Sequence, residues 1–235
     1  FPATRIQGPF TQVFIAKAGG EIVGAATRAI RPTFLNGEII DGGYLSDLRL
    51  VPKFRRGMTL ARGYRYLREL HRDGRTAIYT TVIVEDNEIA LKTLGANRAG
   101  MPSYLDQGRI LTPMISLKKR LPEIPAAIRS GTPEDLPAIV SKLNEKKMQF
   151  QPVYSEGTLI DGRFQNLEAK DFRLLFREGK LVGVMAAWNQ RPFRQTVIKN
   201  YSGAVGVLRP LVNLFRSPPL PATNEPLSFF YIAFA

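Results

Sequence analysis

Residues 44–72, YLSDLRLVPKFRRGMTLARGYRYLRELHR, decide the expected fold of this chain. Their apolar pattern predicts a strand over Tyr44–Val51, which Pro52 ends because proline cannot donate to a sheet ladder. A basic turn follows, and helical apolar spacing predicts a helix that begins at about Met58. Such a strand, turn and helix start favour an anion, because the first-turn N–H groups and the helix dipole both attract negative charge.

The predicted helix has two contrasting faces. Its apolar face carries Leu60, Tyr64, Leu67 and His71, and its basic face carries Arg62, Arg65, Arg68 and Arg72. We expect the arginines to be solvated and the histidine to be a packed surface or core residue. With His71 as the single histidine and no cysteine in the chain, no metal site built from histidine pairs or thiolates is expected.

Composition indicates a globular protein with a strong positive charge. The 235 residues are 44% hydrophobic, which is enough for a core, and 33 Lys+Arg against 20 Asp+Glu give a net charge of +13. The excess is concentrated in residues 53–75, which favours a phosphate-bearing ligand over simple solubility. Nucleic acid is the weaker alternative, because aromatic residues are not interleaved with these cations.

The chain shows no expected membrane segment. FPATRIQGPF, residues 1–10, lacks the basic start and apolar run of a secretory signal. The longest apolar run, Phe229–Ala235, is too short to span a bilayer. We therefore expect a cytoplasmic protein that has no membrane partner.

An antiparallel meander is predicted before the opening stretch. Residues 11–30 form two strands joined by a turn at Gly19-Gly20, and Arg31-Pro32 ends the second strand. Asn36-Gly37 is a further reversal, after which Ile39–Val51 is the third strand.

A parallel crossover is predicted after the helix. The apolar, β-branched run Thr76–Val84 predicts a strand buried on both faces and parallel to Tyr44–Val51. A short helix over Glu88–Leu94, a strand over Arg109–Leu117 and a linker over Lys118–Pro125 follow.

The second half of the chain repeats part of the first. Thr132-Pro133 begins a helix, and Phe172–Phe176 with Lys180–Trp188 forms a hairpin. AGGEIVGAA at 18–26 resembles REGKLVGVM at 177–185, which indicates duplication. Residues 204–226 are then an insertion rich in proline and leucine, and Leu227–Ala235 is expected to be a buried strand.

The residues at 56–61, RGMTLA, resemble the [Gln/Arg]-x-x-Gly-x-[Gly/Ala] loop of the GNAT superfamily of acyl-CoA-dependent N-acyltransferases. Thr59 stands where that family usually has glycine. Leu50-Val51-Pro52 is similar to the end of the family's preceding strand, and Asn87-Glu88-Ile89-Ala90 is similar to its Asn-x-x-Ala helix start. The resemblance implies acetyl-CoA (coenzyme A) as cofactor, with its pyrophosphate on the loop amides.

The resemblance also implies an architecture. It is of the α/β (α+β) class: a GNAT-like mixed sheet with an antiparallel meander and a central strand–loop–helix–strand crossover, present as two GNAT-like units. Residues 1–120 form the first unit, which carries the cofactor loop, and residues 126–235 form the front part of the second. Since neither copy has every family element, we expect the chain to continue in the intact protein or the pieces to complete each other, for example in a homodimer.

The implied site contains two groups of residues. The cofactor-binding group comprises Leu48, Leu50, Val51, Arg55, Arg56, Gly57, Met58, Thr59, Leu60, Ala61 and Asn87. Asp47 is the expected base, with a structural hydrogen-bond acceptor as the equal alternative. The family's proton-donating tyrosine is missing from Leu91-Lys92-Thr93-Leu94, and Tyr104 is the nearest substitute.

Three functions remain open at this stage. The first is an N-acetyltransferase acting on a small-molecule or peptide amine. The second is a non-catalytic GNAT-like module for coenzyme A binding or assembly, which Thr59 and the missing tyrosine motivate. The third is nucleic-acid binding through the basic helix, which would weaken steeply with salt.

Overall fold

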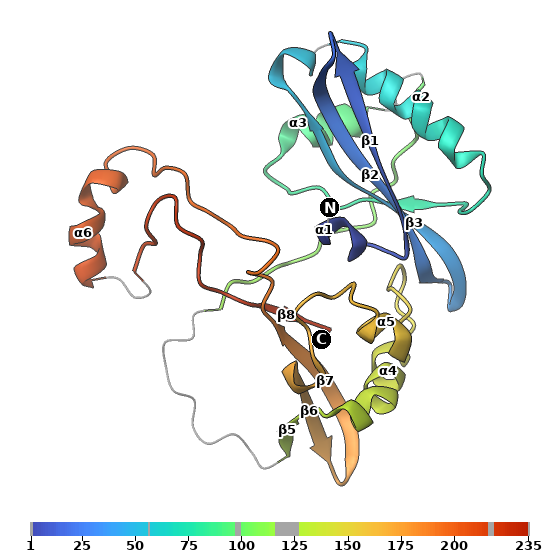
Figure 1. Ribbon diagram of the computed structural model, residues 1–235, viewed down its shortest axis with the longest axis vertical. Coiled ribbons are helices and arrows are strands. Elements are labelled where there is room, and N and C mark those ends of the chain that lie inside the picture. Colours follow the sequence, from blue (N-terminus) through green and yellow to red (C-terminus); the bar gives the residue numbers. More distant parts are fainter. Residues whose placement is uncertain (1, 56, 97–99, 116–126, 216–218, 235) are drawn as a thin grey trace. The chain divides into compact units, whose positions relative to one another are not determined.

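The computed structural model describes residues 2–55, 57–96, 100–115, 127–215 and 219–234. The chain divides into two compact units, Phe1–Ile110 with Lys147–Val153 and Leu111–Lys146 with Tyr154–Ala235. Each unit has its own four-stranded sheet (Figure 1). The fold is therefore mixed α+β, as expected, while the domain limits 1–120 and 126–235 stay a prediction.

The first unit contains the predicted meander and crossover. Its antiparallel strands β1, β2 and β3 are followed by helix α2 and by β4, which pairs with β3 in parallel. In chain order the elements are α1 (Pro2–Arg5), β1 (Phe10–Ala18), β2 (Glu21–Leu35), β3 (Glu38–Leu50), a 3₁₀ turn (Pro52–Phe54), α2 (Thr59–His71), β4 (Tyr79–Thr80) and α3 (Glu88–Leu94).

The predicted turns are confirmed by their backbone angles. Gly19 and Gly20 have φ of 57° and 83°, and Asn36 and Gly37 have φ of 53° and 83°. Positive φ at both central residues fits the twist of a two-residue hairpin, and Gly or Asn adopts it at little steric cost.

The prediction that β2 ends at Arg31-Pro32 is wrong, because the strand continues to Leu35. Proline is tolerated there because the pairing of β2 with β1 extends only to Ile30, so no β1 carbonyl needs a hydrogen bond from Pro32. Residues 150–153 take the place of β1, since the Val153 N–H donates to the Pro32 carbonyl at 2.9 Å and the Phe34 N–H donates to the Gln151 carbonyl at 2.9 Å.

The predicted strand Thr76–Val84 is correct in direction but wrong in length and burial. Only Tyr79 and Thr80 pair with β3, and Val82 and Val84 are 60% and 69% exposed. Among the described residues no strand lies beyond β4, so the run is an edge rather than the centre of a sheet. Burial on both faces would require packed layers on both sides of the sheet.

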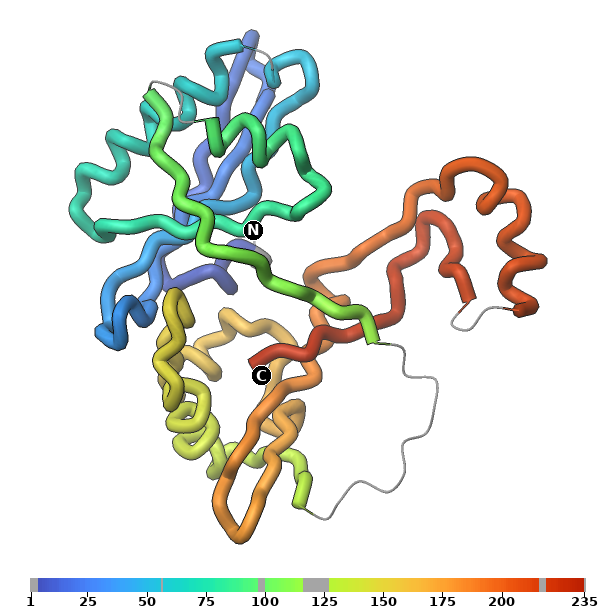
Figure 2. The backbone as a smooth tube through the Cα atoms, turned by 180° about the vertical axis from the view of Figure 1, so that it is seen from behind, coloured from blue at the N-terminus to red at the C-terminus, as the bar shows by residue number. Residues whose placement is uncertain are grey.

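The strand predicted over Arg109–Leu117 is also wrong for the part that is described. Residues 109–115 are extended without sheet pairing (Figure 2), and Met114 is 98% exposed. Apolar residues predict a strand only if a sheet edge receives them, and none does so here. Residues 116 and 117 and the predicted linker Lys118–Pro125 lie outside the described residues.

A buried arginine joins β1, β2, β4 and the end of α2. Arg28 is fully buried, and its guanidinium forms a bidentate ion pair with Asp73 at 2.7 and 2.8 Å. Its Nε donates to the Tyr79 hydroxyl at 2.9 Å and its Nη1 donates to Gln12 Oε1 at 2.9 Å. This hydrogen bonding lowers the pKa of Asp73 well below its usual range.

We expect Asp73→Asn to lower the thermal midpoint of the first unit by about 5–10 °C, because it leaves a buried guanidinium without its counter-ion. Since the folded pKa of Asp73 is lowered, its stabilisation is present above about pH 4 and is lost as pH falls through the lowered value. Thermal melts between pH 2 and pH 7 should show this loss in the natural chain and not in the variant. The control is Glu69→Gln, which breaks the exposed 2.6 Å pair with Arg72 and should change the midpoint little; equal effects would contradict the account.

The second unit has an antiparallel sheet of order β5-β6-β7-β8. Its elements are β5 (Ile128–Ser130), a 3₁₀ turn (Pro133–Asp135), α4 (Leu136–Asn144), α5 (Glu156–Ile160), a 3₁₀ turn (Ala169–Asp171), β6 (Phe172–Arg177), β7 (Lys180–Trp188), α6 (Val205–Phe215) and β8 (Tyr231–Ala233). The predicted helix start at Thr132 and the predicted hairpin are confirmed. Ile139, Leu159, Phe172, Leu174 and Ala186 form the core.

The expectation of a long buried strand over Leu227–Ala235 is wrong. The paired part is Tyr231–Ala233, and Ile232 is 54% exposed. Within the described chain β8 pairs only with β7, and its successive side chains point to opposite faces of the sheet, so Ile232 is uncovered while Tyr231 and Ala233 are partly buried. Phe234 nevertheless packs against the core, with its ring 5.5 Å from that of Phe172.

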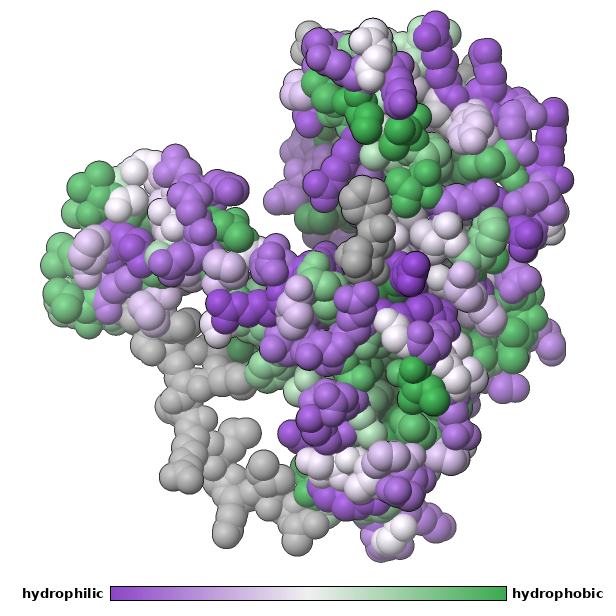
Figure 3. Space-filling model, viewed as in Figure 1, coloured by the Kyte–Doolittle hydropathy of each residue, from purple (hydrophilic) through white to green (hydrophobic). Residues whose placement is uncertain are grey.

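Helix α6 lies within the insertion at 204–226, where no helix was predicted. Its polar side chains turn inward, since Arg209 Nε and Asn213 Nδ2 donate to the Leu220 carbonyl at 3.0 and 3.2 Å. Its apolar side chains face outward (Figure 3), and Phe215 is 87% exposed. In the parts of the chain that the structure describes, no helix is long and apolar enough to cross a membrane.

Candidate functional site

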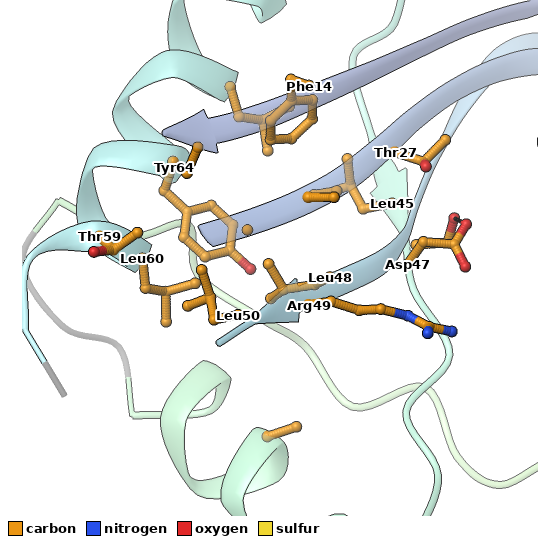
Figure 4. A pocket seen from close by; sticks show the side chains of 18 of the residues that line it. Phe14, Thr27, Leu45, Asp47, Leu48, Arg49, Leu50, Thr59, Leu60 and Tyr64 are labelled. Carbon is orange, nitrogen blue, oxygen red and sulfur yellow. Dashed lines mark hydrogen bonds between the residues drawn. The ribbon is translucent and has the colours of Figure 1, made fainter. Parts of the chain in front are cut away.

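A cavity of about 610 Å³ lies in the first unit, where β3 and β4 separate (Figure 4). The two strands pair only through Gly43–Tyr79 and Tyr44–Thr80. Beyond these pairs, both chain segments line the cavity, together with parts of β1, β2, α2 and α3. Its wall includes Phe14, Lys17, Leu45, Asp47, Leu48, Arg49, Leu50, Thr59, Leu60, Arg62, Tyr64, Asn87, Leu94 and Tyr104.

The close approach of β3 and β4 depends on Gly43. A Cβ at this position would lie 2.3 Å from the Tyr79 ring, and the Gly43 N–H donates to the Ile78 carbonyl at 2.9 Å. After Thr80 the backbone ladder stops, and the Thr81 hydroxyl donates to the Leu45 carbonyl at 2.8 Å. Among the described residues, the rest of this β3 edge has no strand partner, so its N–H and C=O groups can meet a ligand.

A β-bulge interrupts β3 beside the cavity. Ala25 pairs with Arg49 but Thr27 pairs with Ser46, so Asp47 and Leu48 both face Ala26. Asp47 adopts φ of 55°, a left-handed conformation that aspartate tolerates better than most residues. Its Oδ2 accepts from Ser46 Oγ at 3.0 Å and from Gln7 Nε2 at 3.3 Å. The bulge therefore holds an exposed carboxylate at one end of the cavity.

The N-terminus of α2 lies at the other end of the cavity, where Thr59 and Leu60 form the wall (Figure 4). The first intrahelical bond runs from the Arg62 N–H to the Met58 carbonyl, so the N–H groups of residues 59–61 have no helical acceptor. The first turn carries no acid. Its dipole is thus available to an anion.

Cations outnumber acids around the cavity. Lys17, Arg49 and Arg62 line it, whereas Asp47 is the acidic residue in the described wall. Lys17 and Arg49 were not predicted from the sequence as site residues. Lys17 on β1 pairs with Ile22 and Arg49 on β3 pairs with Ala25, so the strand β2 between them sets their relative positions at the cavity. The wall as a whole therefore favours a negatively charged ligand.

The structure brings some of the sequence-predicted site residues together. Asp47, Leu48, Leu50, Thr59, Leu60, Asn87 and Tyr104 line the cavity. Val51, Arg55, Gly57, Met58 and Ala61 are outside its described wall, and Arg56 lies outside the described residues. Arg55 Nε donates to the Leu50 carbonyl at 3.1 Å, which fixes the basic turn to the end of β3.

Asn87 caps the start of helix α3, as the sequence also indicates. Its side-chain oxygen accepts from the Ala90 N–H at 3.2 Å and so caps α3. This cap holds α3 against the cavity, where Leu94 is buried. Among the described residues, no group of three or more His, Cys, Asp or Glu side chains could hold a metal ion.

Tyr64 also lines the cavity, and the sequence did not identify it as a site residue. Its helical spacing predicted only a packed side chain, but its hydroxyl lies 2.7 Å from the Tyr104 hydroxyl. Burial raises the pKa of both tyrosines, so both keep their protons at neutral pH. No sequence signal pairs a helix residue with a loop residue forty positions away, as these two are.

No family model matches this sequence, and no curated protein does so either. Among solved structures, the chain is similar to the aminoglycoside N-acetyltransferase AAC(6')-Iy in complex with CoA, at 20% identity over 49% of this chain and 80% of that one, with a TM-score of 0.38. It is also similar to a transcriptional regulator from Bacillus halodurans, at 13% identity over 46% and 69%, with a TM-score of 0.39. A third is an aminoglycoside acetyltransferase from an uncultured soil metagenomic sample, at 13% identity over 44% and 66%, with a TM-score of 0.34.

Proposed function

We propose that the first unit binds acetyl-CoA in this cavity and transfers the acetyl group to an amine. One observation carries the proposal: from the acid-free start of α2 to the bulge at Asp47, the cavity follows the edge of β3 that has no strand partner in the described part of the chain. A diphosphate with an extended, amide-bearing arm is the shape and chemistry that this arrangement suits. The cavity volume, about 610 Å³, falls in the usual range for small-molecule sites.

The pyrophosphate belongs at the start of α2 in this proposal. The N–H groups of residues 59–61 and the nearby Arg62 supply donors, and Thr59 adds a hydroxyl in place of the glycine of the family that residues 56–61 resemble. The pantetheine amides then pair with the free edge of β3, as an added strand would. The thioester reaches the bulge.

The chemistry belongs at the bulge. Asp47 accepts a proton from the attacking amine, directly or through water, and Tyr104 returns one to the leaving sulfur. The amine is a small molecule or a peptide terminus, which reaches the exposed side of Asp47. Cytoplasmic location, the second unit as a duplicated GNAT-like fold and a homodimer all remain part of the proposal; the shared β-hairpin motif at 18–26 and 177–185 supports duplication.

One observation favours a non-catalytic binding module as the second candidate. Asp47 already accepts two hydrogen bonds, from Ser46 and Gln7. Both bonds end on Oδ2, so the carboxylate has a structural role that requires no substrate amine. This candidate predicts acetyl-CoA binding without transfer to any amine.

The test is amine-dependent release of coenzyme A. Acetyl-CoA is incubated with the purified chain and a panel that includes an aminoglycoside, a polyamine and a peptide with a free N-terminus. Because the chain has no cysteine, a thiol reagent reports only the coenzyme, and mass spectrometry identifies the acetylated amine. Thiol release that requires an amine supports transfer, whereas binding without release supports the second candidate, and no binding at millimolar acetyl-CoA would exclude both.

A further inference from the structure

The hydroxyl pair Tyr64–Tyr104 carries one inference beyond the proposed function. Tyr64 lies on α2, and Tyr104 lies on the chain after α3. Both rings line the cavity and both are half-buried. Figure 4 shows the Tyr64 ring extending from α2 into the cavity toward β3. The hydroxyl oxygens are 2.7 Å apart, which is the usual length of an O–H···O hydrogen bond.

The two tyrosine hydroxyls carry two protons, and the hydrogen bond between them uses one. Each tyrosine hydroxyl has one O–H donor, and one of the two donors is spent between the rings. The second O–H is therefore available to a group inside the cavity. Helix α3 does not supply such a donor, because Ala90 and Leu94, the α3 residues that line the cavity, carry no hydroxyl.

We propose that Tyr64 is a positioning residue that donates its O–H to Tyr104, and that Tyr104 donates its own proton to the leaving sulfur. This inference rests on the proposed acetyl transfer. The amine nitrogen forms the new C–N bond, and the C–S bond breaks with its electron pair going to sulfur. The Tyr104 proton then moves to sulfur to give the free thiol, and the proton that Asp47 took from the amine returns to Tyr104 through water.

The geometry explains why the donor needs its partner. A buried phenolate on Tyr104 would be costly, because burial raises the pKa of that hydroxyl. A hydrogen bond from Tyr64 stabilises the charged form and opposes the rise. Tyr64 is also held on a helix, so its hydroxyl fixes the orientation of a ring on an irregular segment. Removing the Tyr64 hydroxyl should therefore act through Tyr104 and not through cofactor binding.

The test is a double-mutant cycle measured by amine-dependent thiol release. We expect Tyr104→Phe to lower kcat about 100-fold, which is at the low end for a lost proton donor. Tyr64→Phe should lower kcat about 10-fold with little change in the KM for acetyl-CoA. Because Tyr64 acts through Tyr104, the double variant should match Tyr104→Phe alone, whereas independent effects would multiply to about 1,000-fold and overturn the inference.

The matched control is Tyr231→Phe, from the second unit. The Tyr231 ring lies 5.2 Å from that of Phe229, and Tyr231 is not part of the described cavity wall. Losing this hydroxyl should alter kcat less than twofold. A Tyr64→Phe effect that appears in the KM for acetyl-CoA instead of kcat would mean that the pair only packs the cavity, and would also overturn the inference.

A second measurement does not depend on turnover. In protein carrying ¹³C at the tyrosine Cζ position, Tyr64→Phe should shift the Tyr104 resonance and Tyr231→Phe should not. An unmoved Tyr104 signal would contradict the hydrogen bond. If the natural chain acetylates an amine but the effects of Tyr64→Phe and Tyr104→Phe on kcat multiply, only this inference fails. If the natural chain releases no thiol with any amine, the proposed acetyl transfer fails as well.

Discussion

Asp47→Asn is expected to lower kcat for amine acetylation by about 100-fold or more, because the amide cannot accept the proton of the attacking amine. Acetyl-CoA affinity should change little, since the carboxylate lies at the far end of the cavity from α2. Asparagine is the suitable replacement, because Asp47 has φ of 55° and asparagine tolerates this conformation whereas alanine does not. Steady-state kinetics by thiol release and a calorimetric titration of acetyl-CoA measure the two effects separately.

The matched control for this variant is Asp41→Asn. Asp41 is exposed on the same strand but is not part of the described cavity wall. Its replacement should leave kcat and affinity unchanged. If Asp47→Asn also left kcat unchanged in an active protein, Asp47 would be only the acceptor of the Ser46 and Gln7 hydrogen bonds.

Thr59→Glu is expected to weaken acetyl-CoA binding by about 100-fold. The new carboxylate would occupy the first turn of α2, which now carries no acid, and would face the proposed pyrophosphate. Like charges a few ångströms apart near a protein surface repel by several kcal/mol, and the acid also neutralises the helix dipole that attracts the anion. Calorimetric titration measures the dissociation constant.

The control for the charge change is Ala77→Glu, which adds the same carboxylate at an exposed position outside the described cavity wall. It should weaken acetyl-CoA binding less than threefold, because salt screens distant surface charges. Comparable losses from both variants would indicate a general loss of positive charge and not a site at the start of α2.

Local signals in the sequence predicted those parts of the fold that local interactions decide. Gly19-Gly20 and Asn36-Gly37 tolerate positive φ better than other residues and adopt it here, so both hairpins could be located. Asn87 as cap and Gly95 as stop define α3 in the same way. These features depend on residues within one turn of each other, which is the range over which sequence patterns are informative.

Parts of the fold that depend on distant neighbours could not be predicted. Thr76–Val84 has the composition of a central strand, but only Tyr79 and Thr80 pair with β3, and Val84 is exposed. Pro32 was predicted to end β2. Instead, residues 150–153 replace β1 at that edge, and their hydrogen bonds with β2 do not require an N–H at Pro32. In each case the deciding contact comes from a segment that is far away in the chain.

The candidate site shows the same division. The basic turn, the start of α2 and Asp47 were identified from contiguous residues. The bulge that orients Asp47 and Leu48 depends on the register with β2, and the Tyr64–Tyr104 pair depends on where the chain passes after α3. Neither has a signature in the sequence, because both arise from packing.

Hydrogen–deuterium exchange with and without coenzyme A tests the central claim, that the first unit holds the cofactor in this cavity. Saturating coenzyme A should slow exchange at the N–H groups of residues 59–61 and along the free edge of β3 from Leu45 to Leu50, because the ligand would become their hydrogen-bond acceptor. The sheet of the second unit should be unaffected and serves as the internal reference. Unchanged exchange at the start of α2, or slowing confined to the second unit, would contradict the account.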